Sequence, residues 1–187
     1  TCPSCGADSL EFSAREYDIP KFGQVVLYAM FCPRCGYKYS DVVPLREEGP
    51  RAYLFKVRGE EGLRAKVVRS ATASIHIPEL GVSIEPGPAA EAFVTNVEGV
   101  LDRVEGVVAQ LRKDAESDQA REEGARVLKL VSKARRGELP FTLVLVDPRG
   151  ASAIVPEDGE VEILSVDEAR VLLEDLNPSG RRSKRAR

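Results

Sequence analysis

Two short cysteine motifs, Cys2-Pro3-Ser4-Cys5 and Cys32-Pro33-Arg34-Cys35, carry the clearest chemistry in this 187-residue sequence. They contain all four cysteines of the chain, and 26 residues separate them. Four thiolates in two such hooks can converge on one metal ion, and a tetrahedral Cys₄ set is the usual structural zinc site. Gly6 and Gly36 directly follow the hooks, where a glycine lets the chain turn tightly and bring backbone N–H groups toward the sulfurs. We therefore predict one structural Zn²⁺ bound by Cys2, Cys5, Cys32 and Cys35.

Two other uses of these cysteines are consistent with the same spacing. Two disulfide bonds would suit a small secreted scaffold, and a chain of 187 residues without a recognisable leader peptide is a poor match to that class. An iron centre of the rubredoxin type uses the same hooks. Neither alternative leaves an open coordination position, so we expect any metal here to hold shape.

The sequence lacks the motifs of the common enzyme classes. It has no Gly-x-x-x-x-Gly-Lys phosphate loop and no dinucleotide-binding fingerprint. A β-roll can host an iron oxygenase site, but that site needs two histidines, and His76 is the single histidine here. A thioredoxin-like site would use one reactive pair, whereas these two hooks are spaced to share a metal. We expect a protein that is not an enzyme and has no small-molecule substrate.

Composition and charge favour a cytoplasmic protein whose partners are proteins. Hydrophobic residues make up 43% of the chain, and no run approaches the ~20 apolar residues of a membrane span, so no membrane association is expected. The formal net charge is −3, but residues 180–187 hold five basic and no acidic residues. The remainder has 22 basic and 30 acidic residues, a balance of −8 that disfavours general nucleic-acid binding. We expect residues 177–187 to be a disordered basic tail, with RNA contact as the alternative.

The hooks must be positioned by a small β module, which we assign to residues 1–45. Residues 24–31 form a continuous apolar strand leading into the second hook, and residues 37–43 are predicted to be its return strand. The core of such a zinc ribbon is too small to fold without the ion, so metal binding should be coupled to folding. The polar connector at residues 44–50 marks a boundary, and we expect the core of the next domain to be separate.

Residues 51–176 are predicted to form a mainly β domain with an inserted helical hairpin at about residues 95–137. Strands are expected at residues 52–57, 67–77, 82–84, 141–146, 151–155 and 161–164. The first hairpin helix should be capped by Thr95 with Glu98, and the second should end at Gly137. A last helix is expected to begin at Ser165. Strands on both sides of a helical hairpin indicate a β-sandwich or roll.

Arg69 stands out because it lies on the apolar face of the alternating segment 67–77. It is expected either to pair with a buried carboxylate as a structural ion or to contact a ligand or partner. The apolar stripes of the two hairpin helices leave a similar choice, between internal packing and a groove for a partner helix.

Several short motifs follow one order along the chain from Cys2 to about Ile154. Besides the two hooks they are Val68-Arg69-Ser70, Ile75-His76-Ile77-Pro78-Glu79-Leu80, Thr95-Asn96-Val97-Glu98-Gly99-Val100-Leu101 and residues 141–150. The second hook is the most specific, because it continues as Cys-Gly-Tyr-basic-x-x-acidic-Val up to Val42. Together these motifs resemble the ZPR-type zinc-finger family, in its single-unit, archaeal-like form. The resemblance implies an N-terminal Cys₄ zinc ribbon followed by a double-stranded β-helix (jelly-roll-like) domain that carries an α-helical hairpin.

The same resemblance implies a chaperone or adaptor of translation elongation factor 1-alpha. The alternative is a nucleic-acid-binding zinc ribbon of translation or transcription, supported by the basic tail and by Arg34, Tyr37, Lys38 and Tyr39. The acidic body favours a protein partner, because a factor that holds tRNA must present a basic surface. We expect the partner surface on the exposed edge after the second hook, at Tyr37, Lys38, Tyr39 and Asp41, with Arg69 as a further contact. The competing interpretation is that Tyr37 and Tyr39 only cover the zinc hooks.

Overall fold

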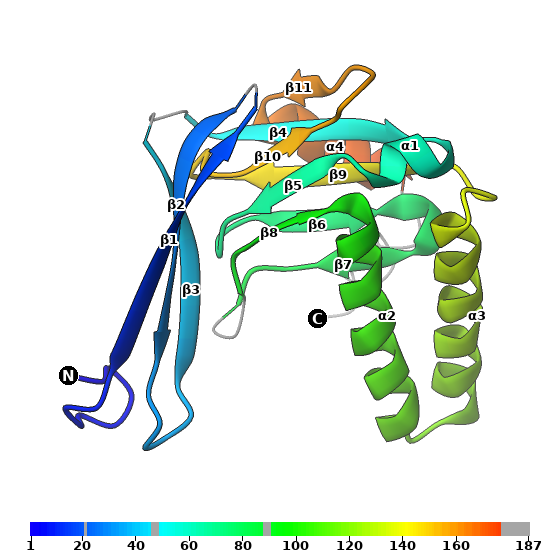
Figure 1. Ribbon diagram of the computed structural model, residues 1–187. Coiled ribbons are helices and arrows are strands. Elements are labelled where there is room, and N and C mark those ends of the chain that lie inside the picture. Colours follow the sequence, from blue (N-terminus) through cyan, green and yellow to red (C-terminus); the bar gives the residue numbers. More distant parts are fainter. Residues whose placement is uncertain (21, 46–48, 88–90, 177–187) are drawn as a thin grey trace.

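A three-stranded ribbon and a β-roll stand side by side in the computed structural model, which describes residues 1–20, 22–45, 49–87 and 91–176 (Figure 1). The strand orders are β1-β2-β3, β10-β5-β8 and β11-β4-β9-β6-β7, and all neighbouring strands are antiparallel. Residues 46–48 of the expected connector and the expected tail at 177–187 lie outside the described residues. No described helix has the length and apolarity needed to cross a bilayer.

The ribbon consists of β1 (Glu11–Ile19), β2 (Gly23–Phe31) and β3 (Lys38–Pro44). The predicted strands at 24–31 and 37–43 agree with β2 and β3 within one residue. Strand β1 was not predicted, because its sequence is mostly polar and almost all of it is exposed. It is a strand because it pairs along its whole length with β2, from Glu11 opposite Phe31 to Ile19 opposite Gly23.

Two facing sheets form the roll. One contains β5 (Lys66–Arg69), β8 (Phe93–Asn96) and β10 (Ala153–Val155). The other contains β4 (Arg51–Val57), β6 (Ser74–Ile77), β7 (Val82–Ile84), β9 (Phe141–Asp147) and β11 (Glu162–Leu164). A short helix α1 (Gly59–Leu63) and a 3₁₀ turn η1 (Pro78–Leu80) connect strands. The chain is therefore mainly β, as the sequence predicted.

The prediction of one continuous strand at residues 67–77 is wrong. The chain turns at residues 70–73, so that β5 enters one sheet of the roll and β6 enters the other. The turn is closed by the Ala73 N–H, which donates to the Ser70 carbonyl at 3.2 Å. Val68 and Ser70, which the alternation placed on the opposite, polar face, are also buried. At such a corner both faces of the chain are covered, so an alternating pattern no longer separates inside from outside.

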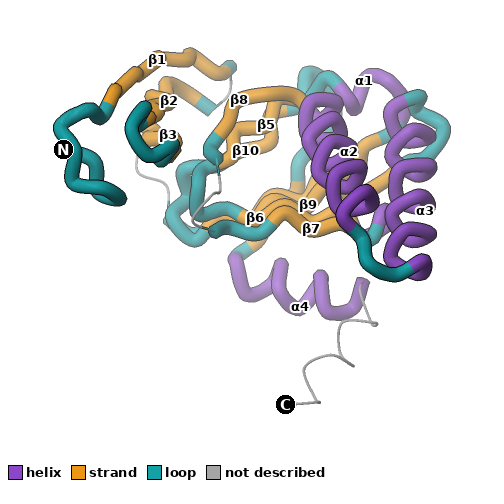
Figure 2. Tube along the Cα trace, turned by 90° about the horizontal axis from the view of Figure 1, so that it is seen from below, coloured by secondary structure: helices purple, strands orange, loops and turns teal. Residues whose placement is uncertain are grey.

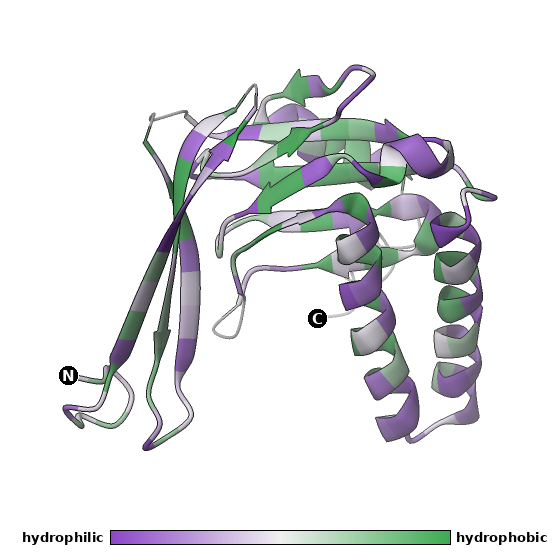
Figure 3. Cartoon of the chain, in the orientation of Figure 1, coloured by the Kyte–Doolittle hydropathy of each residue, from purple (hydrophilic) through white to green (hydrophobic). Residues whose placement is uncertain are grey.

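The hydrophobic core of the roll extends without a break into the ribbon. Ile19, Val25 and Val42, one from each ribbon strand, belong to the same buried cluster as the roll strands. The expectation of two separate cores is therefore wrong at this end of the ribbon. Figure 3 shows the hydrophobic residues concentrated on β4, β5 and β9, whereas the outer part of the ribbon alternates between polar and apolar residues.

The helical hairpin consists of α2 (Val97–Asp114) and α3 (Asp118–Arg135), which lie side by side at the end of the roll away from the ribbon (Figures 1 and 2). Arg135 near the roll joins the two helices through ion pairs with Glu98, Asp102 and Glu105, at 3.8, 3.0 and 2.8 Å. Burial is confined to the roll-proximal half of each helix, at Val97, Val100, Leu101 and Val104 of α2 and at Val127, Val131 and Ala134 of α3. The far half of the hairpin therefore projects beyond the sheets.

Helix α4 (Val166–Leu176) covers the outer face of the five-stranded sheet (Figure 2). Its Ala169 packs in a small second cluster with Ala52 and Leu54 of β4 and with two valines of β9. The predicted start of this helix is confirmed: the Ser165 N–H donates to the Glu168 carboxylate at 2.8 Å, and the Glu168 N–H donates to the Ser165 hydroxyl at 3.2 Å. The predicted end of α3 is also confirmed, because Gly137 has a positive φ of 68°.

The cap of α2 differs from the prediction. The Asn96 side chain accepts a hydrogen bond from the Gly99 N–H at 2.8 Å, whereas Thr95 lies one residue earlier, in β8. We expect Asn96→Ala to lower the free energy of unfolding by about 1 kcal/mol, the usual cost of losing an N-cap acceptor. Thr95→Ala should cost less than half of that amount. Urea titrations of both variants check this order, and a larger loss for Thr95→Ala would contradict the assignment.

Candidate metal centre and adjoining surface

The four cysteine sulfurs converge at the tip of the ribbon farthest from the roll. The Sγ atoms of Cys2 and Cys35 are 3.7 Å apart, those of Cys5 and Cys32 are 3.8 Å apart, and all four lie within 4.8 Å of one another. A zinc ion with four tetrahedral Zn–S bonds of about 2.3 Å places its sulfurs about 3.8 Å apart. None of the four cysteines forms a disulfide. The site therefore fits one tetrahedral Zn²⁺, whose function is to crosslink the two hooks, and the disulfide alternative is wrong.

The two hooks have the same backbone conformation. In the first, the Cys2 N–H donates to the Ala7 carbonyl at 2.7 Å, and in the second the Cys32 N–H donates to the Tyr37 carbonyl at 2.9 Å. Gly6 and Gly36 close the hooks with φ angles of 69° and 75°, in the left-handed region that glycine adopts without strain. The repeated Cys-Pro-x-Cys-Gly motif thus gives two hooks with the same hydrogen-bond pattern and the same turn at glycine.

A serine outside the hooks supports the second of them. The hydroxyl of Ser9 lies 3.3 Å from the Sγ of Cys32. This contact is the largest cause of the lowered pKa of Cys32, which falls to about 6 from the ordinary value of 9. Zinc binds the thiolate form, so a group that stabilises the thiolate also favours metal binding.

Zinc should brace only the tip of the ribbon. We expect about one zinc per purified chain, no colour, and loss of the metal in Cys32→Ser. Hydrogen exchange in that variant should accelerate around both hooks, whereas amides near Ile19, Val25 and Val42 stay protected because they belong to the common core.

Ser9→Ala serves as the matched variant outside the ligand set. It should keep the metal but bind it roughly 10-fold more weakly, as expected for loss of one hydrogen bond to a ligand. Stoichiometric iron with strong visible absorbance, or uniformly faster exchange throughout the chain of Cys32→Ser, would contradict this account.

The residues after the second hook differ in exposure. Lys38 is exposed, and its Nζ lies 5.9 Å from the centre of the Phe31 ring, while Tyr37 and Tyr39 are half-buried. The Tyr39 hydroxyl donates to the Asp41 carboxylate at 3.3 Å, and burial is the largest cause that raises the pKa of Tyr39 to about 12. The Tyr37 carbonyl closes the second hook. These tyrosines therefore support the ribbon as well as contributing to its surface.

An aromatic row crosses the ribbon from β1 to β3. The rings of Phe12 and Tyr28 stack with centroids 6.0 Å apart, and Tyr28 lies 6.1 Å from Tyr39. Phe12 is 66% exposed. Phe12 and Tyr28 were not predicted as surface residues. Tyr28 lies in the predicted strand 24–31, but its neighbour Phe12 belongs to β1, whose polar sequence carries no strand signal.

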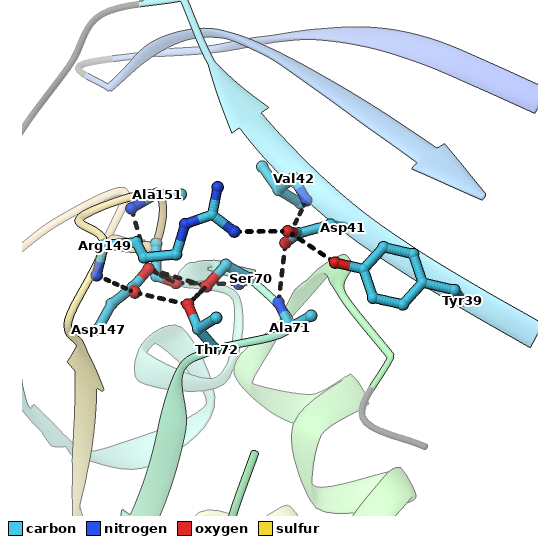
Figure 4. A network of polar contacts seen from close by, with 10 residues as sticks. Tyr39, Asp41, Val42, Ser70, Ala71, Thr72, Asp147, Arg149 and Ala151 are labelled. Carbon is cyan, nitrogen blue, oxygen red and sulfur yellow. Dashed lines mark hydrogen bonds and ion pairs between the residues drawn. The ribbon is translucent and has the colours of Figure 1, made fainter. Parts of the chain in front are cut away.

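The prediction that Asp41 lies on the exposed surface is wrong. Asp41 is 1% exposed and joins the ribbon to the roll (Figure 4). Its carboxylate accepts hydrogen bonds from the N–H groups of Val42 and Ala71 at 2.8 and 3.0 Å and from the Arg149 guanidinium at 3.0 Å. Ala71 belongs to the corner between β5 and β6, and Arg149 follows β9. This carboxylate therefore connects β3 to two separate turns of the roll.

A second buried carboxylate, Asp147, organises the same corner (Figure 4). It accepts hydrogen bonds from the hydroxyls of Ser70, Thr72 and Ser152. The N–H groups of Arg149 and Ala151 donate to it at 2.9 Å each. Asp147 thereby fixes the turn that carries Arg149 and the corner that carries Ala71, the two elements that bind Asp41.

The two ends of the Asp41–Arg149 ion pair should differ in their effect on stability. Asp41→Ala strands buried N–H donors, so we expect a loss of about 3 kcal/mol in the free energy of unfolding. Arg149 is 57% exposed, and its guanidinium remains solvated, so Arg149→Met should cost under about 1 kcal/mol. Guanidinium chloride titrations of the two variants measure both values. Equal losses would show that the ion pair, rather than the buried N–H donors, dominates.

Arg69 is buried, as expected, but it has no ion pair with a carboxylate among the described residues. Its guanidinium donates to the Glu91 carbonyl at 2.8 Å and, at 3.5 Å, to the Glu85 carbonyl. The structural-ion prediction is therefore wrong in its partner: backbone carbonyls take the place of the buried carboxylate. Arg69 also lies on another part of the molecule than Tyr37 and Lys38, at the end of β5 in the roll.

Two segments of the chain, which together cover most of it, match models of a single protein family. Residues 1–47 match the ZPR1 zinc-finger domain, and residues 61–169 match the ZPR1 jelly-roll domain. An uncharacterized ZPR1-like protein of Methanocaldococcus jannaschii is 42% identical over 176 residues, which cover 94% of this chain and 89% of the relative. A ZPR1-like protein of Pyrococcus horikoshii is 41% identical over 178 residues, or 91% of this chain and 78% of the relative. The zinc finger chaperone zpr1 of Schizosaccharomyces pombe is 34% identical over 158 residues, which cover 81% of this chain and 34% of the relative.

Proposed function

The chain belongs to the ZPR1 family of zinc-finger proteins, and we propose that it is a protein-interaction module that acts as a chaperone or adaptor of translation elongation factor 1-alpha in the cytoplasm. It carries one zinc-finger unit and one jelly-roll unit. A chaperone role is supported by the fission-yeast relative, which is named a zinc finger chaperone and of which this chain spans about a third. The names of the related proteins describe zinc-finger proteins and a chaperone, which is consistent with a protein that is not an enzyme.

The observation that carries the proposal is the aromatic row Phe12–Tyr28–Tyr39 on one face of the ribbon, with the exposed Lys38 over Phe31 on the other face of the same strands. These residues stand on a thin sheet that is held at one end by the Cys₄ site and at the other by Asp41 and the common core. A rigid support lowers the entropy lost on binding, and aromatic and cationic side chains supply most of the energy at protein interfaces. The surface is therefore suited to bind a folded or partly folded protein.

The identity of the partner rests on the family resemblance and on charge. Outside residues 180–187 the chain carries eight more acidic than basic residues. A translation factor that holds tRNA presents a basic surface, and opposite net charges accelerate association. The family resemblance names elongation factor 1-alpha as a factor of this kind.

Nucleic-acid binding by the ribbon is the less favoured alternative. An aromatic row can stack with bases, but single-stranded nucleic acid also needs a basic groove that follows its backbone. Residues 1–45 offer four basic residues, Arg15, Lys21, Arg34 and Lys38, against five acidic ones, Asp8, Glu11, Glu16, Asp18 and Asp41. This balance provides no such groove.

The proposal is tested by measuring binding to purified elongation factor 1-alpha. Phe12→Ala combined with Lys38→Glu removes an exposed ring and reverses a charge, and neither side chain contacts Asp41 in the described network. We expect binding to weaken by at least about 2 kcal/mol, the scale of an interface hot spot. Tyr39→Ala with Lys38→Glu should have a similar effect while zinc is retained, and titration calorimetry together with metal analysis checks both variants.

Ile163→Ala is the matched control. Ile163 is 60% exposed, close to the 66% of Phe12, but it lies on the edge strand β11 of the roll. This variant should bind elongation factor 1-alpha as the unmodified chain does. Unchanged binding of both ribbon variants with zinc retained would move the interface away from the ribbon. If the two ribbon variants lost binding to RNA and kept binding to elongation factor 1-alpha, the nucleic-acid-binding alternative would be favoured.

A further inference from the structure

A cavity of about 890 Å³ follows one edge of the five-stranded sheet, apart from the zinc hooks and the aromatic row (Figures 1 and 2). One wall is the continuous segment 81–85, which contains β7. A second wall is the face of α2 on which Val104, Val107 and Leu111 recur at helical spacing. Val107 and Leu111 are 59% and 64% exposed, so no described residue covers this part of the apolar stripe. The cavity is therefore a groove between a sheet edge and a helix.

Strand β7 is the last strand of its sheet. It pairs with β6 on one side, and no described strand pairs with its other side. Such an edge presents backbone N–H and C=O groups that can pair with another chain. The three residues of β7 include no charged residue and no proline, the residue types that commonly block such an edge. The outer edge of β7 can therefore accept a further strand.

The two faces of β7 differ in chemistry. Val82 and Ile84 lie opposite two isoleucines of β6 that are 1% exposed, so these two side chains are on the core side of the sheet. Ser83 lies opposite His76 on the other face, and its hydroxyl is 2.9 Å from the Nδ1 of that ring. A strand added along β7 would continue this alternation. Its side chains should therefore be apolar toward the groove and polar on the outer face.

The accessible charges of the groove are mostly acidic. Glu85, Glu91 and Glu123 are exposed, and Arg103 is the exposed cation of the lining. Glu123 is paired within α3, whereas Glu85 and Glu91 have no ion pair with a lysine or arginine among the described residues. Arg69 is 2% exposed and donates to backbone carbonyls, so it is not accessible to an occupant. This balance favours an occupant with basic rather than acidic side chains.

We propose that this groove binds an extended peptide segment that pairs with β7 as an added strand, with apolar side chains against α2 and a basic side chain near Glu85 and Glu91. In this mode of recognition, main-chain hydrogen bonds to the sheet edge give affinity, and pockets for alternate side chains give specificity. A protein that has not finished folding exposes apolar segments and unpaired strands of this kind. The site goes beyond the proposed function, which uses the ribbon. Its test uses peptides in place of elongation factor 1-alpha, so either proposal can fail without the other.

The probe is the peptide Lys-Val-Thr-Val-Lys-Val, labelled with fluorescein through a glycine spacer. Its valines all lie on one side when it is extended, and fluorescence anisotropy measures its binding to the zinc-bound full chain. Two further forms carry N-methyl groups, one on the valines and one on the lysines and threonine, so that each lacks the N–H donors of one strand edge. We expect one N-methylated form to bind at least about 10-fold more weakly and the other to stay within about 3-fold of the unmodified peptide.

Charge is tested with Glu-Val-Thr-Val-Glu-Val, which should bind at least about 10-fold more weakly than the lysine peptide. Glu85→Gln combined with Glu91→Gln should remove this preference. Glu162→Gln is the matched control, because Glu162 is exposed on β11 outside the groove. This control variant should keep the preference.

The apolar wall is tested with Val107→Asp, which should weaken binding of the lysine peptide at least about 10-fold. Val171→Asp is its matched control, since Val171 is 62% exposed on α4 and lies outside the groove. It should bind the peptide as the unmodified chain does. Both variants change exposed positions, so their urea midpoints of unfolding should match that of the unmodified chain.

Four outcomes would overturn the proposal. Equal affinity of the two N-methylated forms would exclude pairing with a sheet edge, and equal effects of Val107→Asp and Val171→Asp would place the peptide elsewhere. Equal affinity of the lysine and glutamate peptides would contradict the charge of the occupant. Tighter binding of an amphipathic helical peptide of leucine, alanine and lysine would assign the groove to a helix, and a dimer in sedimentation velocity that Val107→Asp abolishes would assign it to a second copy of the chain.

Discussion

The buried carboxylate of Asp41 connects the metal-braced ribbon to the β-roll, and the orientation of the ribbon depends on it. One carboxylate binds the backbone of its own strand, the Ala71 N–H of the roll corner and the Arg149 guanidinium. Buried donors need acceptors, so separating the ribbon from the roll would leave the Ala71 N–H and the Arg149 guanidinium without their acceptor. The common core at Ile19, Val25 and Val42 adds apolar contact at the same junction.

The ribbon is consequently a rigid arm with different stabilisation at its two ends. At the junction it is held by a carboxylate network and apolar packing, and at its tip by four thiolates spaced for a single zinc ion. Nine-residue strands span about 30 Å, and a thin three-stranded sheet with so little buried surface along its length needs support at both ends to stay ordered. Zinc and Asp41 together hold the aromatic row in one geometry, which is the property that a binding surface on so thin a sheet requires.

The hairpin provides a contrasting surface at the opposite end of the roll. Its apolar stripe continues past the last buried residue, Val104, to Val107 and Leu111. The sequence left open whether this stripe serves packing or a partner, and the structure divides it between the two. The half near the roll packs in the core, and the far half forms the wall of a cavity that also contains Arg69 and Arg103.

The sequence by itself determined those features that depend on residues close together along the chain. The hooks, the start of α4 at Ser165 and the end of α3 at Gly137 each involve hydrogen bonds or backbone angles within a few residues, and all three were predicted correctly. Tertiary structure alone decided the rest. Asp41 is buried because it meets Ala71 and Arg149, which are 30 and 108 residues away, and β1 is a strand because β2 pairs with it despite its polar sequence. Arg69 binds backbone carbonyls rather than a carboxylate because loops distant in sequence surround it. A pattern of residue types reports local preference, whereas the partner of a buried polar group is set by which distant backbone the fold brings within hydrogen-bond distance.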